Sequence, residues 1–229
     1  MTHLDTELQQ LRASINDMWG LTISQLHRAQ KAFENNDKEL AHEVIANEKR
    51  LDAFELKICM DCENIMALFN PVANDLRFVL SVLRINYSLE RIGDYARGIA
   101  KLVIKAEQEF SKVCTERIQF DRMFTLATNM VMATGEAFED EKNHSVRAIF
   151  HEDNELDKIN KKSVDVIAEL IKEYPEQTIN LLNLLLAIKK LERIGDLSKD
   201  IAEEIVFYRE AVVLRHKKKK EKEKLTNNS

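Results

Sequence analysis

Apolar residues recur every three or four positions along most of this 229-residue chain. The pattern is typical of amphipathic α-helices, each of which has one apolar stripe to bury. Only five glycines and two prolines interrupt the chain, and Leu, Ile, Glu, Lys and Ala dominate its composition. Because that composition favours long helices over sheets, we predict an all-α protein.

Turn signals divide the pattern into six long helices. Residues 34–37 (ENND) end the first helix, and an Asn or Asp among them is expected to cap the second. The second helix is expected to end near Phe69, ahead of Pro71, and Asn74 or Asp75 to cap the third. The other three helices are expected over about residues 116–140, 145–174 and 176–215.

The six-residue sequence LERIGD occurs twice, at residues 89–94 and 191–196. The only prolines, Pro71 and Pro175, precede the two copies by similar distances. A repeat of this length is too long for a solenoid unit and indicates a duplicated domain. We expect two tandem three-helix bundles, over residues 1–112 and 113–214, joined end to side. Residues 215–229 are expected to form a basic, disordered tail.

Each LERIGD copy places a Glu and an Asp four residues apart, on one face of a helix. A second acidic pair lies about equally far from each proline on its other side. Helices rise equally per residue, so these pairs should meet at one height in an antiparallel hairpin. The two expected carboxylate quartets are Glu48, Asp52, Glu90 and Asp94 in the first half, and Asp153, Asp157, Glu192 and Asp196 in the second.

Four clustered carboxylates repel one another unless a cation lies among them. Oxygen ligands suit hard ions such as Mg²⁺, Mn²⁺, Ca²⁺ or ferric iron, so we predict a metal site in each half. A solvated face is the simpler explanation for one acidic pair, but facing pairs in both halves favour a site. Gly93 and Gly195 are expected to leave space for the cluster or a neighbouring helix, and Arg91 and Arg193 to balance charge or hold an anion.

The formal net charge of −5 is unevenly distributed. Residues 215–224 hold seven Lys or Arg and two Glu, so their charge is +5 and that of the remaining chain is −10. An acidic body argues against nucleic acid as the main partner. The basic tail would either attract anionic lipid weakly or remain a solvated end.

Neither a secretory signal nor a membrane-spanning segment is visible in the sequence. Three cysteines fit a reducing compartment, and the C-x-x-C at Cys59 and Cys62 is interpreted as a pair of packing residues, because no second pair accompanies it. We therefore expect a cytoplasmic protein. Apolar positions such as Phe207 and Val213, expected on the surface, favour a homodimer.

The doubled LERIGD, with an acidic pair upstream of each copy, resembles the PhoU family of phosphate-uptake regulators. The resemblance extends over about residues 4–209 and includes Asp75-Leu76-Arg77. It implies two three-helix bundles whose E/D-x-x-x-D motifs bind metal, in some members multinuclear iron or zinc clusters. By this resemblance the two quartets would be the metal ligands. Tyr95 and Leu197 stand where relatives often have His.

The resemblance also implies a negative regulator of phosphate uptake and of the phosphate-starvation response. Its partners would be the ATPase subunit of a phosphate ABC transporter and a phosphate-sensing histidine kinase, at the inner face of the inner membrane. The sequence leaves the metal open among iron, zinc, manganese, magnesium and calcium.

Two alternatives remain at this stage. A carboxylate-bridged di-iron oxidase uses Glu-x-x-His pairs, and Glu39–His42 and Glu141–His144 have that spacing. Both pairs lie at expected helix starts, away from the carboxylates, and no nucleophile–base pair or phosphate-binding Gly-rich loop is visible, so we expect no enzyme. The second alternative is a metal-stabilised helical scaffold unrelated to phosphate.

Overall fold

The computed structural model describes residues 2–139 and 144–211, and the prediction of an all-α protein is confirmed over these residues. No helix in this part of the chain combines the length and the apolar character that crossing a membrane requires. The elements are α1 (His3–Glu34), α2 (Lys38–Phe69), α3 (Ala73–Lys105), α4 (Lys112–Arg117), α5 (Phe120–Glu139), α6 (His144–Glu173), the 3₁₀ turn η1 (Pro175–Gln177) and α7 (Thr178–Glu210).

A side-chain cap marks the start of α2, but none marks the start of α3. Asp37 caps α2 as expected, accepting a hydrogen bond from the backbone N–H of Leu40 at 2.9 Å. The expectation that Asn74 or Asp75 caps α3 is wrong. The N-cap residue is Val72, and no side chain makes a capping hydrogen bond there. The chain leaves α2 through Asn70 in the left-handed conformation and is helical again directly after Val72. Asn74 and Asp75 therefore lie inside the first turn.

The single helix expected over residues 116–140 is two helices. Gln119, between α4 and α5, has φ 57°, which a right-handed helix cannot accommodate. The link between the halves thus folds as a short helix of its own. At the other end, α7 stops at Glu210, before the expected residue 215, because Ala211 takes a left-handed conformation. The basic tail and Val213 lie outside the described residues.

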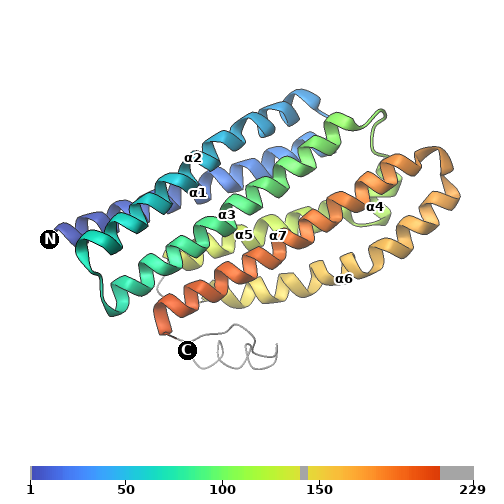
Figure 1. Ribbon diagram of the computed structural model, residues 1–229. Coiled ribbons are helices and arrows are strands. Elements are labelled where there is room, and N and C mark those ends of the chain that lie inside the picture. Colours follow the sequence, from blue (N-terminus) through green and yellow to red (C-terminus); the bar gives the residue numbers. More distant parts are fainter. Residues whose placement is uncertain (1, 140–143, 212–229) are drawn as a thin grey trace.

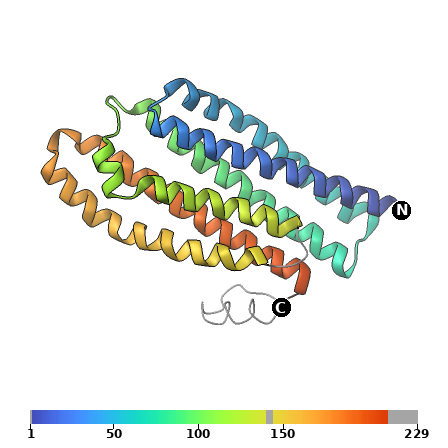
Figure 2. The ribbon, with the colours of Figure 1, turned by 180° about the vertical axis from the view of Figure 1, so that it is seen from behind.

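The helices form two layers. In Figure 1 α2, α3, α7 and α6 lie side by side, and the reverse view in Figure 2 shows α1 and α5 covering one side of them. The two halves pack along their lengths, α3 against α7 and α1 against α5, so the expected end-to-side junction is wrong. Buried apolar residues of both halves form one continuous core, which explains this arrangement.

The two LERIGD copies lie at the same level of the molecule. Ser81, early in α3, donates a hydrogen bond to the backbone oxygen of Glu204, late in α7, at 3.4 Å. Gly98, further along α3, lies against the side chain of Lys190, nearer the start of α7. The two helices therefore run antiparallel, and the LERIGD copies meet midway between these contacts. Ile92 and Ile194, one from each copy, are fully buried there.

The glycine at the fifth position of LERIGD allows the neighbouring helix of the same half to pack closely. A Cβ added to Gly93 would collide with the side chain of Leu51 on α2. A Cβ on Gly195 would lie 3.3 Å from the Leu156 side chain on α6. Leu51 and Leu156 directly precede the upstream aspartates of the quartets. The close approach therefore fixes the helix spacing at the carboxylate level, as expected from the glycines.

We predict opposite effects for alanine at two helical glycines. Gly20→Ala should stabilise the protein by about 1 kcal/mol, because a Cβ there meets nothing within 4 Å and alanine is the better helix former. Gly93→Ala should lose that gain and destabilise by about 1 kcal/mol, because the buried Leu51 must move. Urea denaturation of both variants measures the difference. Equal stabilisation by both would show that α2 does not depend on the missing Cβ.

Candidate functional site

The first quartet lies between α2 and α3, where one arginine joins two of its four carboxylates. Glu48 and Asp94, the outer pair, lie farther from Pro71, and the inner pair is Asp52 and Glu90. Arg97 Nε lies 2.6 Å from Glu48 Oε1, and Arg97 Nη2 donates a hydrogen bond to Asp94 Oδ1 at 2.6 Å. Glu48 and Asp94 are equally distant from Pro71, so the helix register expected from the sequence brings them together.

The inner pair of this quartet has no basic partner among the described residues. Burial raises the pKa of Glu90 above its ordinary value, and the charges of Asp94 and Asp52 raise it further. The pKa of Glu48 is also raised, first by burial and then by its hydrogen bond with Asp94, although Arg97 opposes the change. The negative charges of Asp52 and Asp94 therefore lie close enough to Glu48 and Glu90 to help raise the pKa of those two carboxyl groups.

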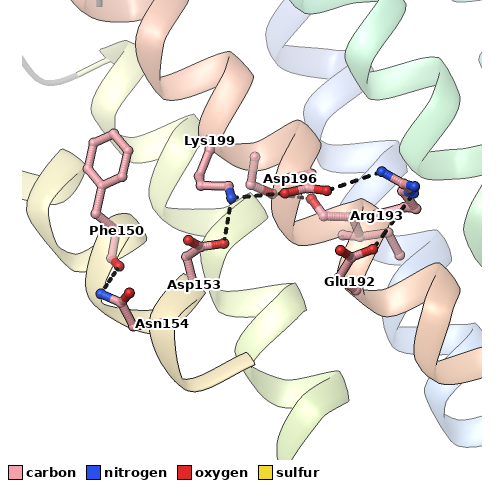
Figure 3. A network of polar contacts seen from close by, with 9 residues as sticks. Phe150, Asp153, Asn154, Glu192, Arg193, Asp196 and Lys199 are labelled. Carbon is pink, nitrogen blue, oxygen red and sulfur yellow. Dashed lines mark hydrogen bonds and ion pairs between the residues drawn. The ribbon is translucent and has the colours of Figure 1, made fainter. Parts of the chain in front are cut away.

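The second quartet repeats this arrangement between α6 and α7. Lys199 Nζ lies 2.9 Å from Asp153 Oδ1 and 2.9 Å from Asp196 Oδ1, as Figure 3 shows. Asp153 and Asp196 are the outer pair here, and Asp157 and Glu192 the inner pair. Asp153 is the most deeply buried of these three residues, with 5% of its side chain exposed. Burial lowers the pKa of Lys199, but the hydrogen bonds with Asp196 and Asp153 outweigh it and raise the pKa overall.

A second cation borders this quartet on its solvent side. Arg193 Nη1 lies 3.4 Å from Asp196 Oδ2, and its Nε lies 3.7 Å from Glu192 Oε2 (Figure 3). The pKa of Glu192 is raised by burial and by Asp196, against the opposing charges of Arg193 and Lys189. Arg193 thus balances charge as expected. Arg91, its counterpart in the first half, is exposed and makes no ion pair with a described residue.

Sequence reasoning missed the two residues that hold the outer pairs together, Arg97 and Lys199. Each follows the aspartate of its LERIGD copy by three residues, and the two occupy equivalent positions of the repeat. Residues three apart are neighbours on a helix surface, so the signal was present as D-x-x-R and D-x-x-K. Each copy of the repeat therefore supplies the basic residue that contacts its own outer carboxylates.

The sequence predicts a metal ion at each quartet, held by carboxylate oxygens. Carboxylate oxygens suit a hard cation. Across residues 2–139 and 144–211, however, no three Asp, Glu, His or Cys side chains are grouped closely enough to hold a metal ion. The oxygens of each outer pair contact Arg97 or Lys199 instead. In this arrangement the quartets do not fit a metal ion, and metal ligation stays a prediction.

Two other candidate motifs play no part in the quartets. Glu39 and His42, of the oxidase alternative, are exposed in the first turn of α2, and Glu141 lies outside the described residues. Cys62 is fully buried, and burial raises the pKa of its thiol to about 12. Its Sγ donates to the backbone oxygen of Val79 at 3.8 Å, as suits a packing residue.

The fold and the quartets define a class of helical protein with an internal duplication, whose halves join through their third helices and each carry an acidic cluster. Comparison with known families identifies the class. The model of the PhoU domain matches twice, at residues 15–103 and 120–205. The chain belongs to the PhoU family, which consists of regulatory accessory proteins and not of enzymes.

Relatives are similar over nearly their whole lengths. The phosphate-specific transport system accessory protein PhoU homolog of Borreliella burgdorferi is 30% identical over 210 residues, which cover 90% of this chain and 94% of the relative. The crystal structure of PhoU from Pseudomonas aeruginosa superposes with a TM-score of 0.84 at 26% identity, covering 92% of this chain and 100% of that one. The phosphate transport system regulatory protein PhoU of Streptococcus pneumoniae gives 0.80 at 26% identity, covering 93% and 99%.

We predict that Lys199→Met destabilises the protein by about 3 kcal/mol, because it removes the ammonium group that contacts the buried Asp153. Lys158→Met is the matched control, since Lys158 is 68% exposed and its pairing with Glu155 should contribute less than about 1 kcal/mol. Denaturant unfolding in chelator-containing buffer measures both. Similar losses in the two variants would show that Lys199 is not needed to neutralise Asp153.

A second prediction follows from the raised pKa of Glu90. The native state binds this proton more tightly than the unfolded state, so stability falls as pH rises from about 4.5 through the raised pKa. Glu90→Gln should therefore stabilise the protein at neutral pH and weaken that fall, whereas the exposed Glu39→Gln should do neither. Thermal unfolding across this pH range measures the effect. Lower stability of Glu90→Gln at neutral pH would contradict the assigned sign.

Proposed function

We propose that this protein is an accessory regulator that restrains phosphate uptake and keeps the phosphate-starvation response off when phosphate is plentiful. The observation that carries the proposal is the match to the PhoU domain in both halves. Relatives named as accessory proteins of phosphate-specific transport support it, because they match this chain over nearly their full lengths.

The proposed partners are the ATPase subunit of a phosphate ABC transporter and a phosphate-sensing histidine kinase. The body of the chain, without residues 215–224, carries a formal charge of −10, which suits a basic patch on a partner. Leu56 and Met60 on α2 and Leu182 and Leu186 on α7 are exposed apolar side chains that such partners would cover. Nucleic acid is not among the proposed partners.

The proposed location is the cytoplasm, at the inner face of the inner membrane. The lysine-rich segment 215–224 would add about 1 kcal/mol of attraction to anionic lipid for each basic residue near the surface.

A homodimer also remains a proposal. Of the residues from which it was expected, Phe207 is partly buried within the single chain, and Val213 lies outside the described residues.

Within the proposal the two halves, expected over residues 1–112 and 113–214, act as one rigid body over their described residues, because α3 and α7 share a core. The quartets lie between α2 and α3 and between α6 and α7, at the level where the LERIGD copies meet. Changes in charge at either quartet would therefore reach the joint between the halves.

The proposal is tested by deleting the gene and complementing it. Deletion should leave phosphate-starvation genes expressed in phosphate-rich medium, and the wild-type gene should restore repression. Complementation by Lys158→Met should succeed as well, because that side chain is 68% exposed and is not among the apolar side chains proposed to contact a partner. If the deletion strain keeps these genes repressed and its phosphate uptake unchanged, the regulator proposal fails, and a helical scaffold unrelated to phosphate takes its place.

A further inference from the structure

A basic side chain occupies the same place in both quartets. Arg97 and Lys199 stand at one position of the repeat, three residues after the aspartate of LERIGD. Each reaches from the third helix of its half to a carboxylate on the second helix, Glu48 or Asp153, while keeping contact with its own Asp94 or Asp196. The two halves of the chain thus make the same contact.

We propose that Arg97 and Lys199 are the resident cations of the two quartets, and that a divalent or trivalent metal ion enters a quartet only by displacing them. The inference goes beyond the regulatory function and does not depend on it, since it concerns the ionic state of the protein by itself.

The geometry makes the two kinds of cation mutually exclusive at the outer pairs. The nitrogens of Arg97 lie 2.6 Å from one oxygen on each helix, and the single ammonium of Lys199 lies 2.9 Å from one oxygen on each. A metal ion joining the same two helices would need those oxygens at about 2.0–2.6 Å. It would then stand in contact with a guanidinium or ammonium group, whose like charge repels it at short range.

The two quartets differ in how firmly the resident cation is held. Lys199 is 24% exposed and bonds Asp153, of which only 5% is exposed, and Arg193 adds a second positive charge at Asp196 and Glu192. Arg97 is 28% exposed and contacts Glu48, of which 16% is exposed, with no second cation among the described residues. A metal ion should therefore displace Arg97 more readily than Lys199, so the first quartet should be the first to load.

The test measures Mn²⁺ binding to the chelator-treated full chain, by electron paramagnetic resonance of the free ion. Arg97→Gln and Lys199→Gln should each bind Mn²⁺ at least about tenfold more tightly than the wild type, because the competing charge is gone. The matched controls are Arg91→Gln and Lys161→Gln, both exposed and without an ion pair to a described residue, and they should bind as the wild type does. Arg97→Lys keeps the charge and should retain weak binding.

Melting temperatures are a second measurement, which distinguishes Mn²⁺ binding at a quartet from a general loss of stability in the variants. Mn²⁺ should raise the melting temperature of Arg97→Gln and Lys199→Gln, while the wild type should respond neither to Mn²⁺ at the same concentration nor to chelator. If Lys199→Gln does not fold, Arg97→Gln and the chelator response of the wild type still decide. Unchanged Mn²⁺ affinity in Arg97→Gln, or a wild type that melts lower in chelator, would overturn the proposal. Neither result bears on the deletion phenotype.

Discussion

The antiparallel packing of α3 against α7 is the contact on which the rest of the molecule depends. Each of these helices buries residues toward its own half and toward the other half, so neither bundle closes its core alone. Burial of apolar surface is the largest favourable contribution to folding, and here it is shared between the halves. The two LERIGD copies meet at the centre of this contact, between the Ser81–Glu204 hydrogen bond and the packing of Gly98 against Lys190.

The carboxylate quartets lie at the level of that contact and depend on close helix packing there. Gly93 and Gly195 bring α2 and α6 close to α3 and α7 at the level of the quartets. Close helices force the acidic residues on their edges together, at a cost in repulsion and desolvation that shows in the raised pKa values of Glu90 and Glu192. Arg97 and Lys199 offset this cost at the outer pairs, and the inner pairs keep an excess of negative charge.

An excess of negative charge lies at equivalent places of the two halves, in a family that consists of accessory proteins. The quartets are tied to the joint between the halves through Leu51 on Gly93 and Leu156 on Gly195.

The sequence by itself determined the helical class, the duplication and the height at which the carboxylates meet. Helical periodicity, the proline turns and the constant rise per residue are local properties, and Glu48 opposite Asp94 follows from counting outward from Pro71. Only the tertiary structure decided that the halves lie side by side and that Gln119 splits the helix between them, because both depend on packing between distant residues. It also decided which cation the outer carboxylates contact. Arg97 and Lys199 were visible in the repeat, but a lysine or arginine on a helix reaches many places, and the position of α2 or α6 selects one of them.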